Sequence, residues 1–406
     1  MRMSYYLQKQ YSNQKWYIYT ILFIWLRSYF STLWRWLGIE GDIMNCIILL
    51  FLFIQSQNVW KGRILIKDFV LYFVIVFCYT FSVLLYPATS GYVHANAFSV
   101  ICCIVPYIFV GEIFQTTNYE KWINYASRFA VFMNVVLILT SRSSGDEIDN
   151  EYMHRAYSLL PSVLFVLWQY IKNRRIIDLV FFCIGLVLIL SMGSRGPVVC
   201  ILFFVGSYLL FFKQYKRPIV FKSIIIGILS LLFFYTQYIA ELMVAFFSKY
   251  SLSTRVFDMM LDDAFLNYED SNGRNIIHEI LFQKLNNDTG GIGFGLFSDR
   301  STIAMFSKEI TYSHNMFVEL WFSFGYYVGT FIALLLLVFV AFFFYKIKNR
   351  DKQIFALLLF SVSVIKLQFS SSFIVDQSLF FLIGYCIYGI RESKCKTSGI
   401  IKISNK

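Results

Sequence analysis

The stretch that decides the fold class runs from Leu320 to Tyr345 and reads LWFSFGYYVGTFIALLLLVFVAFFFY. It contains no charged side chain over its whole length. A membrane-crossing helix needs about 20 consecutive apolar residues, because the hydrocarbon core is about 30 Å thick and each residue adds about 1.5 Å. The stretch is therefore long enough to cross a bilayer as one helix.

The composition extends this conclusion to the whole chain. Hydrophobic residues make up 58% of the 406 residues, charged residues only 15%, and the mean hydropathy is +0.61. Soluble domains average about 25% charged residues, and disordered chains combine low hydrophobicity with high net charge. The composition excludes both classes and predicts an all-α, polytopic membrane protein.

Further apolar runs set the expected number of helices. Seven are uncharged: residues 43–60, 69–86, 97–111, 156–171, 179–194, 196–212 and 223–240. Four are short or contain a charge: residues 16–36, 122–141, 353–375 and 377–390. Together with 320–345 they predict about 12 transmembrane helices.

The basic residues support one orientation of these helices. With both termini in the cytoplasm, the inner segments hold most of the 36 Lys and Arg residues, whereas the short outer loops hold only Arg142, Arg155 and Arg195. Cytoplasmic loops of membrane proteins are enriched in Lys and Arg. Topology thus accounts for most of the net charge of +12, and we expect no nucleic-acid partner.

This topology divides the chain linearly. The expected parts are nine helices in 1–236, one large extracytoplasmic loop at 237–313, three helices in 314–391 and a cytoplasmic tail at 392–406. Apolar residues at helical spacing, such as Ile277, Ile280 and Leu281, predict short packed helices in the loop. All four histidines (His94, His154, His278 and His314) fall on the outside, so we expect any chemistry at the outer face.

Two arginines stand at defined positions on that face. Arg195 lies in a tight turn between two apolar runs, beside Gly196 and Pro197. Its planar guanidinium matches phosphate oxygens, although an arginine at a helix end also reaches lipid headgroups without further function. Arg274 follows the turn residues Asn272 and Gly273, and so falls in the first turn of a predicted helix.

The macrodipole does not favour a cation in that first turn. Arg274 therefore requires another reason, either an anionic ligand or a surface salt bridge with Glu269 or Asp270, which is worth little.

Two short motifs follow in the loop. Gly291, Gly293 and Gly295 form a GxGxG string without a strand–helix context, which argues against a nucleotide site and for a backbone that approaches a ligand or another helix. His314, where the chain re-enters the membrane, exchanges protons near neutral pH; the alternative is a cap or interface residue. Glu319 lies one turn beyond Asn315.

Two features lie within the apolar runs. Gly325 and Gly329 form a GxxxG pattern, which indicates helix packing. Charges inside a membrane segment mark function by default. Arg27, Arg35 and Arg128 could each extend to the interface, whereas Lys366 lies mid-span and calls for a lipid phosphate or a carboxylate such as Asp376.

The order of these motifs resembles a known family. SRG (Ser194, Arg195, Gly196) at a helix exit, GR (Gly273, Arg274), the GxGxG string and HNxxxE (His314, Asn315, Glu319) cover about residues 185–345. In this order and placement they resemble the bacterial O-antigen ligase and O-antigen or capsule repeat-unit polymerase superfamily, with the Wzy-type polymerase favoured.

The resemblance implies a GT-C-like membrane glycosyltransferase at the outer face of the bacterial cytoplasmic membrane. Its donor and acceptor would be undecaprenyl-diphosphate-linked oligosaccharides, with a chain-length regulator as a possible partner. The family is thought to work without a metal or other cofactor, and the outer segments contain no His/Cys/Asp cluster at ligand spacing.

The resemblance also implies roles for single residues. Arg195 and Arg274 would bind the substrate diphosphate, and His314 would act as the general base, with Glu319 orienting it or serving as an alternative base. Gly293, Gly295 and Asn315 would position the loop.

Two other functions remain open. A ligase would use the same donor but transfer finished chains to lipid A core. A lipid-linked oligosaccharide flippase or other transporter also fits the number of helices, although it needs no outer loop of this length.

Overall fold

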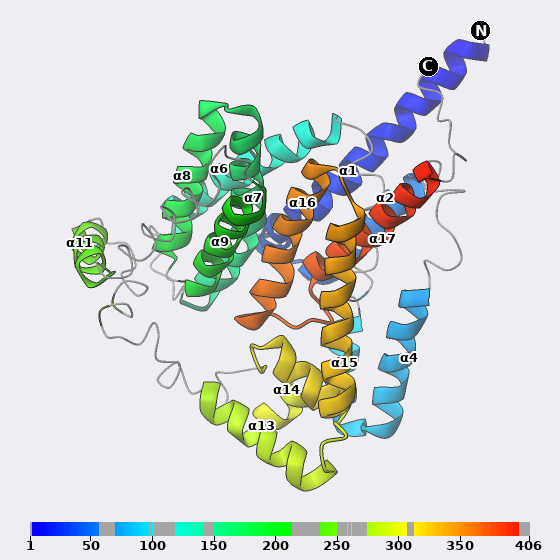
Figure 1. Ribbon diagram of the computed structural model, residues 1–406, viewed down its shortest axis with the longest axis vertical. Helices are drawn as coiled ribbons and strands as arrows, with labels where there is room; N and C mark the ends of the chain where they lie inside the picture. Colours follow the sequence, from blue (N-terminus) through cyan, green and yellow to red (C-terminus); the bar gives the residue numbers. More distant parts are fainter. Residues whose placement is uncertain are drawn as a thin grey trace. The chain divides into compact units, whose positions relative to one another are not determined.

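The computed structural model describes residues 2–56, 70–97, 100, 118–141, 149–192, 194–212, 236–249, 258, 261, 274–306 and 312–397 (Figure 1). Within these ranges the chain is helical and contains no strand, which confirms the all-α fold class. The chain divides into two compact units, which are described separately. Unit 1 consists of Met1–Ala126 and Ile277–Lys406, and unit 2 of Ser127–Ile276.

The α-helices have the following bounds. Unit 1 contains α1 (Arg2–Trp36), α2 (Gly41–Gln55), α4 (Val70–Leu85), α14 (Ser298–Ile303), α15 (Met316–Lys346), α16 (Arg350–Phe360) and α17 (Gln377–Thr397). Unit 2 contains α7 (Asp149–Asn173), α8 (Ile176–Ser191), α9 (Arg195–Ser207) and α11 (Thr236–Lys249). Two helices extend across the boundaries between the units, α6 (Asn118–Ser141) and α13 (Arg274–Thr289).

Few of these helices meet the requirements for crossing a membrane. Within the described ranges, only Arg195–Phe212 and α15 are long and apolar enough, and the pair Tyr72–Leu85 and Pro87–Ala97, bent by 116°, is a third candidate. The structure does not support the expected 12 spans. The 15 residues of α2 and the 16 of α8 extend only about 23 Å, less than the hydrocarbon core.

Most of the expected apolar runs are nevertheless helical. Residues 97–111 and 223–240 lie largely outside the described part of the chain. The run 353–375 is helical as far as Gln368, because α16 ends at Phe360 and is followed directly by a π-helical turn and a short 3-10 turn. The irregular segment that follows, 369–376, becomes part of the candidate site.

Charges inside the apolar runs pair with carboxylates. Lys366 binds Asp376, which confirms one of the two partners expected for it. Arg128 donates two hydrogen bonds, of 3.0 and 2.7 Å, to Asp178, whose side chain is fully buried. Arg27 pairs with Asp42 at 3.0 Å. Arg27 and Arg128 therefore make ion pairs rather than simply extending to the interface. A buried charge without such a partner would cost several kcal/mol.

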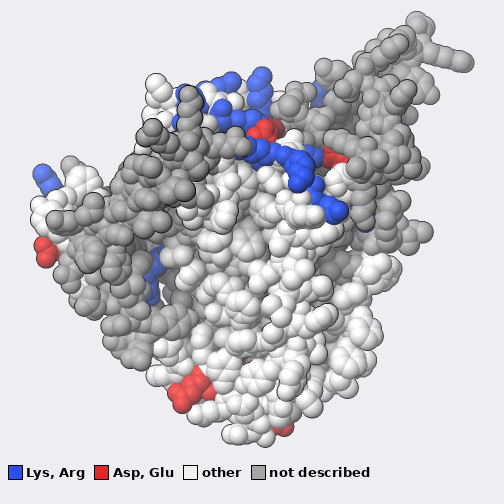
Figure 2. All heavy atoms as spheres, in the orientation of Figure 1, with Lys and Arg blue, Asp and Glu red and all other residues white. Residues whose placement is uncertain are grey.

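The longest apolar helix, α15, has two parts. They meet at Gly325, whose φ of +81° and ψ of 167° are not helical and put a kink in the helix. Beyond Gly325 one side of the helix is exposed, with Phe331 64% and Val338 64% accessible. Figure 2 shows a broad surface without charged side chains over α15. An exposed apolar surface of this kind is typical of contact with lipid.

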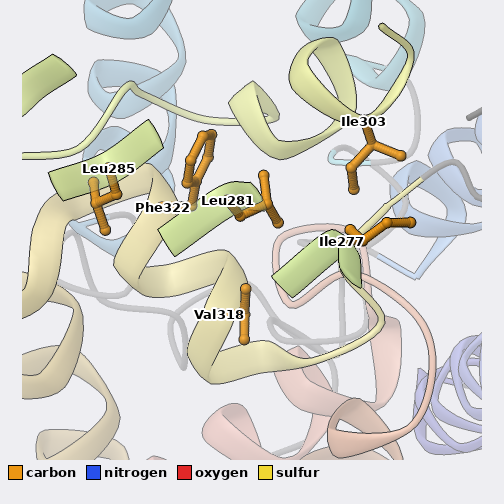
Figure 3. Close-up of a cluster of buried hydrophobic side chains, with 6 residues drawn as sticks. All are labelled: Ile277, Leu281, Leu285, Ile303, Val318 and Phe322. Atoms are coloured by element: carbon orange, nitrogen blue, oxygen red, sulfur yellow. The ribbon is translucent and has the colours of Figure 1, made fainter. Parts of the chain in front are cut away.

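A buried cluster joins α13, α14 and the first turns of α15 (Figure 3). Ile277, Leu281 and Leu285 recur every four residues and so share one side of α13. They pack against Ile303 of α14 and against Val318 and Phe322 of α15. The cluster confirms that packed helices form within residues 237–313, and it holds α14 beside the start of α15.

Candidate functional site

The site is built around the segment that leads into α15. Asn315 caps this helix, because its side-chain oxygen accepts hydrogen bonds from the backbone N–H of Phe317 (2.9 Å) and Val318 (3.3 Å). His314 precedes the cap and has φ +55°, a left-handed conformation that is uncommon for residues other than glycine. The cap expected as an alternative role for His314 therefore belongs to Asn315.

Hydrogen bonds from three other parts of the chain hold this segment. The backbone N–H of Ser313 donates to Asp299 Oδ2 at 3.0 Å, and the carbonyl oxygen of Ser313 lies 2.7 Å from His278 Nε2. The Tyr312 hydroxyl lies 3.2 Å from Ser370 Oγ and accepts from the N–H of Ser371. Residues of α13, α14 and segment 369–376 thus hold the Ser313 backbone and the Tyr312 side chain, directly before His314. Strained backbone of this kind persists only where its surroundings impose it.

The rings of Tyr312 and His314 stack, with 3.8 Å between their centroids and 33° between their planes. The hydrogen bonds to the Tyr312 hydroxyl hold the tyrosine ring in place, and this ring covers one face of the imidazole. The contact with Tyr312 thus restricts the position of the imidazole.

Glu319 binds the segment that follows the 3-10 turn, and its expected role as an orienting residue or alternative base stays a prediction. Its side chain is buried, and its two oxygens accept hydrogen bonds from Ser372 Oγ and from the N–H of Phe373 (3.0 Å). Glu319 therefore holds segment 369–376, which in turn holds Tyr312. Its link to His314 therefore runs through that segment and Tyr312.

A second buried carboxyl lies on α14. Asp299 is fully buried, and its Oδ1 has no hydrogen-bond partner within the described residues. Burial raises the pKa of Asp299, and the hydrogen bond from Ser313 and the charge of Arg300 oppose that shift only in part. Arg300, the next residue, lies over the rings of Phe297 (4.7 Å) and Tyr312 (5.9 Å). A cation therefore lies against the ring on which His314 stacks.

The glycine string packs on α15, one of the two partners expected for it. The N–H groups of Phe294 and Gly295 donate to the carbonyls of Phe322 and Ser323, and the N–H of Tyr326 donates to Gly291. A Cβ on Gly293 would lie 2.5 Å from the backbone nitrogen of Gly325. Only glycines allow this approach, which occurs at the break in α15.

The GxxxG pattern belongs to the same break. A Cβ on Gly329 would lie 2.7 Å from the carbonyl oxygen of Leu320 in the same helix, and Trp321 Nε1 donates to Thr330 Oγ1 across the break at 2.8 Å. The two glycines therefore shape the bend of α15 rather than a contact with another helix.

The predicted arginines begin two other helices. Arg195 is the first residue of α9, after an extended Ser194, and belongs to unit 2. Arg274 is the first residue of α13, where the turn at Asn272 and Gly273 predicted a helix start; its side chain lies outside the described part. Unit 1 brings His314, Asn315, Glu319 and the glycines together, whereas their grouping with Arg195 and Arg274 stays a prediction.

Sequence reasoning missed Asp299, Arg300, Ser370 and Ser372. The only local signals are an adjacent acidic and basic residue shortly after the glycine string and a run of three serines at 370–372. Neither pattern predicts which distant segment these side chains meet. In the part of the chain that the structure describes, no group of three or more His, Cys, Asp or Glu side chains is placed to hold a metal ion.

Comparison of the chain with protein-family models, with curated proteins and with solved structures found no match.

Proposed function

We propose that this chain is a polysaccharide repeat-unit polymerase of the bacterial cytoplasmic membrane. It would transfer the growing glycan from undecaprenyl diphosphate to an incoming lipid-linked repeat unit at the outer face, with both termini in the cytoplasm and a GT-C-like arrangement of helices. The order of the sequence motifs between residues 185 and 345 is the basis of this assignment.

The structural observation that supports the proposal is the placement of His314. Its backbone is held in a left-handed conformation, its ring stacks on Tyr312, and it lies immediately before the longest apolar helix. A fixed imidazole beside an apolar helix suits a reaction in which one substrate is a lipid and the other provides a hydroxyl group.

The proposed reaction is a displacement at the anomeric carbon of the donor sugar. An acceptor hydroxyl oxygen forms the new bond to that carbon while the bond to the diphosphate oxygen breaks, and His314 accepts the hydroxyl proton. Negative charge develops on the leaving lipid diphosphate, where fixed cations stabilise it. Arg195 and Arg274 are the cations that the sequence motifs assign to this task.

The test uses a cell that synthesises the lipid-linked repeat unit but lacks its own polymerase. Expression of the wild-type chain should restore a ladder of surface polysaccharide. His314→Ala should reduce chain lengthening by at least about 100-fold, since a positioned general base contributes roughly 10²–10⁴-fold. His94→Ala is the matched control, because His94 is exposed and lies outside the site.

The products also distinguish the alternatives. Cells without polymerase activity still display a single repeat unit on their surface glycolipid. Loss of a flippase would remove even that unit, and loss of a ligase would leave long chains on undecaprenyl diphosphate. A normal ladder from His314→Ala would refute the assignment of the base.

A further inference from the structure

Arg300 is a cation that the proposed mechanism does not use. Its guanidinium carbon lies 4.7 Å from the ring centre of Phe297 and 5.9 Å from that of Tyr312. Cation–π contacts of this kind hold a guanidinium by its flat face. They leave the N–H groups at its edge available for a ligand in the guanidinium plane.

Arg300 is not neutralised by a carboxylate at contact distance. Among the residues that the structure describes, it forms no ion pair, and its buried Nε has no hydrogen-bond partner. A buried donor without a partner costs about 1–3 kcal/mol. The side chain as a whole is only partly buried, so a ligand can contact its exposed part, whereas Nε itself is buried.

Two buried carboxyl groups, those of Asp299 and Glu319, interact electrostatically with Arg300. Both oxygens of Glu319 accept hydrogen bonds from Ser372 and Phe373, and Glu319 makes no ion pair with Arg300 at contact distance. Burial raises the pKa of Asp299. Arg300 is not held at contact distance by either carboxyl group.

We propose that Arg300 binds a phosphate group of the substrate beside His314. Tyr312 contacts both residues, because its ring centre lies 3.8 Å from that of His314 and 5.9 Å from the guanidinium carbon of Arg300. The presence of an anion site rests on Arg300 itself, whereas the identity of the anion as a lipid-linked diphosphate rests on the proposed function. Arg300 would then hold the leaving group while His314 acts on the acceptor.

The test measures ligand binding by the full-length protein purified in detergent. Inorganic pyrophosphate and farnesyl diphosphate, a short prenyl diphosphate, are titrated separately while tryptophan fluorescence is followed. Arg300→Gln should weaken binding roughly 10- to 100-fold, the usual value of a charge-assisted hydrogen bond. Arg300→Lys should fall between the two, because lysine keeps the charge but not the planar fork.

Arg391→Gln is the matched control. Arg391 also lies over a tyrosine ring, that of Tyr388 at 5.4 Å, but near the end of α17. Its replacement should leave both affinities unchanged. Gel filtration and circular dichroism establish that each variant is folded; if Arg300→Gln is not, Arg300→Lys decides, and an affinity within about twofold of wild type overturns the role of the guanidinium.

The outcomes separate this proposal from the proposed function. Wild-type affinity in a folded Arg300→Gln variant, or binding of neither ligand by the wild-type protein, overturns the anion site. Arg300-dependent binding of pyrophosphate without binding of farnesyl diphosphate supports the anion site and overturns the lipid-linked ligand. Equal competition by phosphatidylglycerol would show that the site accepts any phosphate headgroup, and would also overturn that ligand. A normal ladder from His314→Ala refutes the polymerase base and leaves the Arg300 result standing.

Discussion

The two parts of α15 on either side of Gly325 are chemically opposite. In the part before Gly325, Glu319, Leu320 and Phe322 are buried, and backbone carbonyls bond to the glycine string. In the part after it, Phe331, Leu335 and Val338 are exposed and no charge occurs before Lys346. The two parts of one kinked helix thus lie in different environments, the first buried in protein and the second exposed on one side.

This difference shows how a single apolar run is divided between a buried, hydrogen-bonded part and a part with an exposed apolar side. The hydropathy of the stretch from Leu320 to Tyr345 is high throughout, because the value of each residue depends on its type and not on its surroundings. Packing distinguishes them, since the first part faces α13 and α14 whereas the second has one side without protein contact. The break at Gly325 is the point at which the environment changes.

The largest difference between the two parts is expected when one leucine in each part is replaced by alanine. Leu320 is 2% exposed and Leu335 is 57% exposed. Leu320→Ala should lower the free energy of unfolding by about 2–5 kcal/mol, because it leaves a cavity, and Leu335→Ala should change it by less than about 0.5 kcal/mol. Denaturant titration of both variants in the same detergent measures the difference; equal values would show that the two parts are not distinct.

The next largest effect is expected at the break itself. Gly325→Ala should lower the free energy of unfolding by about 2–4 kcal/mol, because a left-handed residue with a side chain costs about 1–2 kcal/mol and overpacking adds a similar amount. A Cβ at Gly325 would lie 2.3 Å from the carbonyl oxygen of Gly291. The thermal midpoint and the polysaccharide ladder should both fall.

The control for this change is Gly206→Ala in α9. A Cβ on Gly206 meets nothing within 4 Å, so this variant should be as stable as wild type or slightly more stable. If Gly325→Ala behaved in the same way, the close approach between the glycine string and α15 would be wrong.

The smallest change in the free energy of unfolding is expected at Glu319. The Glu319→Gln variant tests whether Glu319 acts as a hydrogen-bond acceptor or as a proton acceptor. Glu319→Gln should cost about 1–2 kcal/mol, because glutamine keeps one acceptor oxygen and the Ser372 hydroxyl can turn to accept from its amide. Chain lengthening should persist in Glu319→Gln and be lost in Glu319→Ala, which leaves Phe373 N–H without its partner. Loss of activity in a stable Glu319→Gln variant would instead make Glu319 a proton acceptor in the reaction.

Parts of the fold and the site followed from local sequence. The helix start at Arg274, the helical spacing of Ile277 and Leu281, and the pairing of Lys366 with a carboxylate were predicted from neighbouring residues alone. The number of spans was not, because apolar content does not reveal that α2 and α8 end after 15 and 16 residues, nor that the helix in the run 353–375 changes to a π-helical turn after Phe360 and ends at Gln368. In that run, Ser361 and Ser363 donate to backbone carbonyls four residues earlier, and such bonds often bend helices.

By itself, the sequence determined that this is an α-helical chain with lipid-compatible helices, since composition and charge spacing are properties of local runs. It also identified His314 and the glycine string, because few other residue types exchange protons near neutral pH or allow such a close backbone approach. Only the tertiary structure placed Arg300 and Ser370 against Tyr312, Asp299 against Ser313 and Ser372 against Glu319. It also assigned the glycines to the break in α15. Those contacts join residues that are distant in sequence, and no local pattern encodes which distant partner a side chain meets.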